Sequence, residues 1–216
     1  NGNAALRAAQ PVSDQDTDLV GRFRNSGLVT LGRSSSSEFG TLPVVETEAY
    51  GATRNPWNTG HTSGGSSGGA GAAVASGMVP FAHASDGGGS IRIPASCCGL
   101  VGLKPSHGRI GMGPQRSETG LGIDFCVSRS VRDTARLLDA VALPGIGDVA
   151  TLPRPDRSFA DHVAADPGAL RIGLLDPRPP GRDLHPDWVA AARSAASVLE
   201  GRGHDVTPAE VKSLRG

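Results

Sequence analysis

Apolar side chains recur at helical spacing near the start of the chain. Leu19, Val20 and Phe23 fall at i, i+1 and i+4, which places them along one face of a helix. We predict that this helix covers residues 14–26. Gly27 follows directly and is positioned to end the helix.

The rest of the chain alternates between short apolar runs and longer segments with helical spacing. Ser130 and Asp133 resemble a capping box at the start of one of these helices. Alternation of strands and helices predicts an α/β fold, with a mixed β-sheet core flanked by helices. The predicted strands cover 28–31, 79–82, 170–175 and 204–206, and the predicted helices cover 68–78, 130–142 and 186–199.

Two stretches lack such periodicity. Residues 34–66 are rich in Ser, Thr, Gly, Asn and Pro and predict loops, and residues 143–169 predict a Pro/Gly-rich surface connection. We therefore expect residues 1–216 to form part of one domain.

Composition narrows the classes of function. Of the 216 residues, 38% are hydrophobic and 19% charged, as in a globular protein. The formal net charge is zero, so no basic field indicates nucleic acid or an anionic membrane as a partner. No apolar run approaches the ~20 residues that span a bilayer. An odd count of three cysteines is a poor disulfide framework and favours a reducing, cytoplasmic location. The six histidines are scattered without zinc-ligand spacing, so we expect no metal.

The candidate chemistry lies in residues 86–92, where three successive glycines precede Ser90. Glycines allow backbone conformations closed to other residues and leave their N–H groups accessible. Such a turn can direct several donors at one point, as an oxyanion requires. Ser90 could then attack a carbonyl carbon while these amides bind its oxygen.

Three alternatives compete for the glycine-rich segments. A flexible Gly/Ser linker is disfavoured by the apolar, turn-fixing residues that follow Ser90. Gly64–Gly68 satisfies the G-x-S-x-G elbow pattern, but an elbow needs a strand before it and residues 55–63 predict a loop. A phosphate-binding loop would need G-x-x-x-x-G-K-[ST], which the chain lacks.

Several segments together resemble the amidase signature family. They are GRSSSSEFG at 32–40, RNPW at 54–57, GGSSGG at 64–69, ASDGGGSIRIPA at 84–95, CGLVGLKP at 98–105 and the weaker VSRSVRD at 127–133. The central stretch is far more specific than any single short motif. The resemblance implies an enzyme that hydrolyses carboxylic, linear amides through a Ser–cis-Ser–Lys triad, without a cofactor.

The resemblance also implies a role for individual residues. Ser90 would be the nucleophile, and Ser66, 24 positions earlier and preceded by a cis peptide bond, would be the bridging serine. The oxyanion hole would consist of the backbone amides of Gly87, Gly88, Gly89 and Ser90. Supporting, structural roles would fall to Ser67, Asp86 and Arg92.

The lysine of the triad has no counterpart in this sequence. The family's lysine lies well before the bridging serine, whereas the two lysines here are Lys104 and Lys212. Either the protein has a lysine before Asn1, or it is a lysine-less relative. The absence of an initial methionine favours an interior fragment, with N-terminal and C-terminal parts missing and inactive by itself.

Two alternative functions are compatible with this resemblance. A glutaminase subunit of a tRNA-dependent amidotransferase has the same triad, and an amidase fold without activity would act as a binding module. The expected partner is a small-molecule amide. A homodimer, common in the family, and association with the rest of a cleaved chain stay open.

Overall fold

The computed structural model describes residues 2–9, 12–114, 120–175 and 183–210. The chain divides into two compact units, Asn1–Ala164 and Ala165–Gly216. Both antiparallel and parallel strand pairs are present, among helices, which confirms the predicted mixed α/β class.

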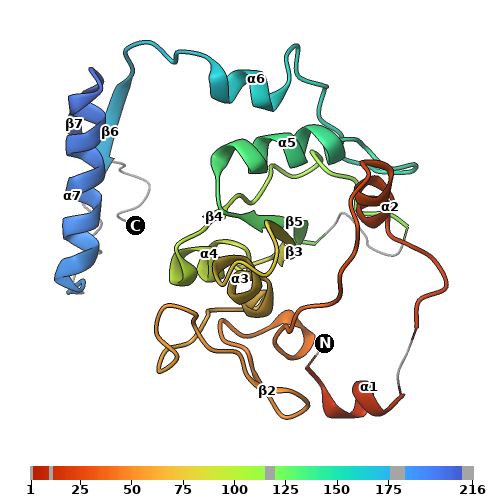
Figure 1. The fold of residues 1–216 in the computed structure, drawn as a ribbon. Coiled ribbons are helices and arrows are strands. Elements are labelled where there is room, and N and C mark those ends of the chain that lie inside the picture. Colours follow the sequence, from red (N-terminus) through yellow and green to blue (C-terminus); the bar gives the residue numbers. More distant parts are fainter. Residues whose placement is uncertain (1, 10–11, 115–119, 176–182, 211–216) are drawn as a thin grey trace. The chain divides into compact units, whose positions relative to one another are not determined.

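The first unit is built around a three-stranded antiparallel sheet in the order β3-β5-β4. Its strands are β3 (Phe81–Asp86), β4 (Val101–Gly102) and β5 (Ile123–Ser128). Figure 1 shows α5 (Val131–Val141) above the sheet, with α3 (Gly68–Ala75) and α4 (Arg92–Cys98) below it. The other elements of this unit are α1 (Ala4–Ala9), α2 (Asp18–Asn25), the 3-10 helix η1 (Glu38–Gly40), β1 (Glu46–Thr47), β2 (Gly51–Ala52) and α6 (Phe159–Ala164).

The core lies where α3 and α5 pack against the sheet. β5 is its centre, because Phe125 and Val127 are completely buried between the two helical layers. From α3, Ala70 and Val74 reach the same cluster. Small side chains let α3 approach the sheet closely, which explains how a helix containing three glycines is held by packing despite their poor helix propensity.

Residue Arg22 joins α2 to the end of α5. Its guanidinium donates hydrogen bonds to the carbonyl oxygens of Val141 (3.1 Å), Leu143 and Pro144 (2.7 Å). These carbonyls lie at the last residue of α5 and just after it, where a helix leaves acceptors without internal partners. Arg22 therefore caps α5 from a segment more than a hundred residues earlier in the chain.

The second unit contains β6 (Arg171–Leu175), α7 (Pro186–Gly201) and β7 (Asp205–Ala209). The two strands pair in parallel, with Ile172 opposite Val206. No residue of these three elements is fully buried, so this part of the described chain has no closed core of its own.

Most helices fall where the sequence predicts them. The predicted helix over 14–26 is α2, capped by the Thr17 side chain. At the start of α5 the Ser130 hydroxyl accepts the Asp133 N–H (3.1 Å) and donates to its carboxylate (2.7 Å), which confirms the predicted capping box. The predicted helices over 68–78 and 186–199 correspond to α3 and α7, and the strands over 170–175 and 204–206 to β6 and β7.

Other expectations were wrong. The predicted strand over 28–31 is irregular, with Val29 and Leu31 80% and 76% exposed, because no neighbouring strand pairs with it. The strand placed at 79–82 is β3 at Phe81–Asp86, which puts Asp86 at the end of a strand. The connection over 143–169 contains α6.

Candidate functional site

Ser66 lies in a tightly enclosed segment between β2 and α3. The residue is 2% exposed, and the peptide bond between Gly65 and Ser66 is cis, as the family resemblance implies. The Ser66 carbonyl oxygen accepts the Ser37 N–H (3.1 Å). A Cβ atom placed on Gly40 would be 3.6 Å from the Ser66 hydroxyl oxygen. Residues 35–40, which we call the strap, therefore lie directly against this serine.

Glycines around Ser66 are required by the closeness of neighbouring backbone. A Cβ atom on Gly65 would lie 2.6 Å from the Val44 nitrogen, closer than real contacts permit. At Gly69 the added carbon would collide with the backbone of Ser35, whose carbonyl oxygen accepts the Gly69 N–H (3.0 Å). The GGSSGG run thus allows three backbone segments to meet.

The turn before Ser90 is organised by the Asp86 carboxylate. This carboxylate is completely buried and accepts the backbone N–H groups of Gly89 (2.7 Å), Ile91 (3.2 Å) and Arg92 (3.4 Å). The Arg92 guanidinium adds two bonds, at 2.9 and 3.0 Å. Burial by itself would raise the pKa of Asp86, but the bonds from Arg92 and the backbone outweigh it and lower that pKa to about 2. The bridge to Asp86 raises the pKa of Arg92 in return.

The glycines of this turn differ in what their amides do. The Gly89 N–H is committed to Asp86, and the φ of Gly89 is 130°, a conformation that side chains disfavour. Among the described residues, nothing lies within 4 Å of a Cβ placed on Gly88, and a Cβ on Gly87 would touch only the Gly122 Cα, at 4.0 Å. Within the described residues, the N–H groups of Gly87, Gly88 and Ser90 make no hydrogen bond. These three amides are therefore the donors available to a ligand.

The two serine segments meet through Ser67. Its backbone N–H donates to the Ser90 carbonyl oxygen (3.4 Å). Its hydroxyl accepts the Ser85 N–H (3.2 Å) and lies 3.4 Å from the Ser85 carbonyl oxygen. Ser67 thus connects the start of α3 both to the end of β3 and to Ser90, and it brings Ser66 next to the glycine turn.

The RNPW segment holds the far end of α4, the helix that begins just after Ser90. The Asn55 side-chain amide donates to the Cys97 carbonyl oxygen (2.7 Å), and the Trp57 indole N–H donates to that of Cys98 (2.8 Å). These bonds satisfy carbonyls that the helix end leaves free. The segment therefore holds the C-terminal end of α4 in place and does not contribute a reacting group.

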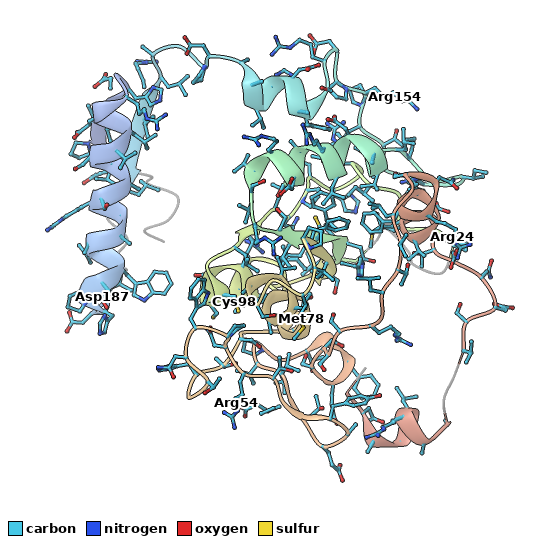
Figure 2. The ribbon with its side chains drawn as sticks, in the orientation of Figure 1. Arg24, Arg54, Met78, Cys98, Arg154 and Asp187 are labelled. Carbon is cyan, nitrogen blue, oxygen red and sulfur yellow. The ribbon has the colours of Figure 1, made fainter. Side chains whose placement is uncertain are left out.

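The two adjacent cysteines of α4 have different surroundings. Cys98, labelled in Figure 2, is buried, and burial, with a smaller contribution from Cys97, raises its pKa to about 11. A thiol with so high a pKa is a poor nucleophile at neutral pH. Cys97, in contrast, is exposed.

The lysine expected for the triad is missing from the described residues. Lys104 is part of the loop after β4, where its amine donates to the Pro105 carbonyl oxygen (3.3 Å), and Lys212 lies outside them. Across the described ranges, no group of three or more His, Cys, Asp or Glu side chains could hold a metal ion. No helix among these residues is long and apolar enough to cross a membrane.

The strap could not be identified from the sequence as a partner of Ser66. Ser37 is buried, with its hydroxyl accepting the Leu42 N–H (3.3 Å) and its backbone N–H donating to Ser66. The run of four serines at 34–37 belongs to one of the family motifs, but nothing in it distinguishes the buried serine from its neighbours.

Comparisons with known proteins show which family the sequence matches. A model of the family described as Amidase matches residues 4–215. The 6-aminohexanoate-cyclic-dimer hydrolase of Pseudomonas sp. (strain NK87) is 47% identical over 207 residues, covering 94% of this chain and 42% of that protein.

Solved structures extend the similarity to the fold. A 6-aminohexanoate cyclic dimer hydrolase superposes with a TM-score of 0.93 at 44% identity, over 99% of this chain and 45% of the other. A glutamyl-tRNA(Gln) amidotransferase subunit from Thermotoga maritima reaches a TM-score of 0.82 at 29% identity, over 97% of this chain and 46% of that one. The chain spans less than half the length of each of these relatives.

Proposed function

Since the chain belongs to the amidase family, we propose that it carries the two serines and the oxyanion-binding turn of an amide hydrolase. Ser90 is the nucleophile and Ser66 is the bridging serine. The single observation that carries the proposal is the bond from the Ser67 N–H to the Ser90 carbonyl oxygen (3.4 Å), because it brings the two serine segments together.

In the proposed reaction a neutral lysine accepts the proton of Ser66, which in turn accepts the proton of Ser90. Desolvation can keep a buried lysine neutral near pH 7. The lysine would come from a part of the full-length protein outside these 216 residues, whose curated relatives are more than twice as long.

Ser90 then forms a bond to the amide carbon, and the carbonyl oxygen becomes an oxyanion. We assign the amides of Gly87, Gly88 and Ser90 to that oxygen, because their N–H groups are available. The sequence-based assignment also included Gly89, whose N–H donates to Asp86. Gly89 contributes instead by its backbone conformation. The relay returns the proton to the leaving amine, and water hydrolyses the acyl-enzyme.

The proposed substrate is a small carboxylic amide, and the proposed location is the cytoplasm. A stand-alone hydrolase is favoured over an amidotransferase subunit by identity, 44% to the cyclic dimer hydrolase structure against 29% to the Thermotoga protein. Ammonia release from glutamine that depends on a partner protein would support the amidotransferase role instead. Rates of hydrolysis by the full-length protein, measured on a panel of linear amides and on the 6-aminohexanoate cyclic dimer, would define the substrate.

The test uses Ser90→Ala in the full-length protein, with ammonia or amine release as the measurement. We expect turnover to fall to background, since no other group takes the role of the nucleophile. The exposed Ser76→Ala, at the end of α3, is the matched control and should retain full turnover. Retained turnover in Ser90→Ala would exclude Ser90 as the nucleophile. The 216-residue chain alone should be inactive, because it lacks the lysine.

A further inference from the structure

Ser37 makes hydrogen bonds to two different segments of the chain. Its backbone N–H donates to the Ser66 carbonyl oxygen (3.1 Å), and its hydroxyl oxygen accepts the Leu42 N–H (3.3 Å). The residue is 1% exposed, although serine is mostly found at protein surfaces. A buried hydroxyl is normally retained where it satisfies a hydrogen bond, and here that bond is the one from Leu42.

Two backbone segments contact the Gly65–Ser66 pair, and Ser37 joins them. One is the strap, which binds Ser66 through the Ser37 N–H. The other is residues 42–44, since a Cβ atom on Gly65 would lie 2.7 Å from the Leu42 carbonyl oxygen and 2.6 Å from the Val44 nitrogen. The bond from the Leu42 N–H to the Ser37 hydroxyl connects the second segment to the first.

The strap also borders the hydroxyl group of Ser66. A Cβ atom on Gly40 would lie 3.6 Å from that hydroxyl oxygen. Within the strap the Ser37 carbonyl oxygen accepts the Gly40 N–H (3.2 Å), so the two residues belong to one closed turn. A displacement of Ser37 would therefore change the surroundings of both the carbonyl and the hydroxyl of Ser66.

We propose that Ser37 is a positioning residue for the proton relay, which holds the Ser66 hydroxyl at the place where it accepts the proton of Ser90. Ser37 acts through the backbone of the Ser66 segment and does not touch the substrate. Relays of this kind depend on geometry, and a misplacement of about 1 Å can cost about 100-fold in rate. This inference rests on the proposed function, since it needs Ser66 and Ser90 to be the reacting pair.

The test measures the proposed amide hydrolysis by the full-length protein and by its Ser37→Ala, Ser37→Cys and Ser34→Ala variants. Titration of Ser90 to completion with a fluorophosphonate counts the folded, reactive molecules, so that kcat is obtained per titrated site. The exposed Ser34 belongs to the same run of serines, and Ser34→Ala is the matched control that should keep the wild-type kcat.

Ser37→Ala removes the acceptor of the Leu42 N–H. We expect its kcat per titrated site to fall about 10-fold or more while KM stays unchanged, because the substrate contacts are not altered. Ser37→Cys keeps the side-chain volume but offers only a weak sulfur acceptor, so its kcat should lie between those of the wild type and the alanine variant.

Other roles of Ser37 predict different results. A purely structural role would lower the number of titrated sites and leave kcat per site unchanged, which would overturn the inference. A raised KM without a loss of kcat, an equal loss in Ser34→Ala, or a wild-type kcat in Ser37→Cys would overturn it as well. If Ser37→Ala does not fold, the kcat of Ser37→Cys decides alone. Turnover that survives in Ser90→Ala would instead refute the proposed function.

Discussion

The glycines around Ser66 and those before Ser90 stand in different surroundings. Around Ser66, a Cβ atom on Gly65 or Gly69 would meet the backbone of another segment. Before Ser90, no atom of the structurally described part of the chain lies within 4 Å of a Cβ placed on Gly88. Steric crowding explains glycine in the first segment and cannot explain it in the second.

The difference indicates that the Ser66 segment is a packed support and that the turn before Ser90 is open to a ligand. The Ser66 segment is buried and bound to the strap, so its position is set by protein contacts alone. The Ser90 turn is shaped from its inner side by Asp86, while Gly87 and Gly88 keep exposed backbone on its outer side. Donors that are preorganised and left free are what an oxyanion site requires.

The largest expected effect is a loss of stability when a glycine of the buried Ser66 segment is replaced. In Gly69→Ala the added methyl group collides with the Ser35 backbone, so we expect a loss of about 3 kcal/mol in unfolding free energy, the upper end of the range typical of overpacking. Urea unfolding of the full-length protein measures it. The matched control is Gly21→Ala in α2, where nothing lies within 4 Å and the free energy should rise by about 0.5–1 kcal/mol. Equal, small effects at both positions would contradict the crowding.

A smaller effect on stability is expected from the Asp86 carboxylate, which shapes the turn before Ser90. The pKa of Asp86 falls from 3.8 to about 2 on folding. A lowered pKa stabilises the fold above the unfolded value, and this contribution is lost as the pH falls from about 4 through 2. The shift corresponds to about 2 kcal/mol. Urea unfolding of wild-type protein and Asp86→Asn over this pH range should show that part of the acid dependence only in the wild type. The same dependence in both would exclude Asp86 as its source.

The smallest expected effect on stability comes from a substitution in the open turn before Ser90. Gly88→Ala should change the unfolding free energy by no more than about 0.5 kcal/mol, because the added methyl group has no atom of the described residues within 4 Å. The proposed amide hydrolysis by the full-length protein should still fall, since the methyl group enters the space proposed for the substrate carbonyl. Thermal unfolding and amide hydrolysis separate the two effects. A stability loss as large as that of Gly69→Ala would remove the distinction between the segments.

Local sequence signals predicted those parts of the fold that depend on local interactions. The capping serine and apolar face at 130–142 determine α5, and the glycine-rich runs predicted the position of the candidate site. The sheet was harder to predict, because its central strand β5 was not recognised, although its buried residues depend on pairing with β3. The run at 28–31 is equally apolar, yet it has no strand partner and stays exposed.

The candidate site was likewise predicted only in part, because some of its features depend on contacts between distant segments. Resemblance to a family identified Ser66, Ser90 and the residues around them. It could not show that the Gly89 amide is used by Asp86, or that the strap holds Phe39 in a left-handed conformation beside Ser66. Both facts depend on where backbone groups from separate segments point, which neither composition nor spacing records.

The most direct test is a crystal structure of the full-length protein after reaction with a fluorophosphonate. The adduct should be a single phosphorus bonded to the Ser90 hydroxyl oxygen. Its phosphoryl oxygen should lie about 2.7–3.1 Å from the amide nitrogens of Gly87, Gly88 or Ser90, with the Ser66 hydroxyl beside the Ser90 oxygen. An adduct on another residue, or a phosphoryl oxygen directed away from these amides, would contradict the account.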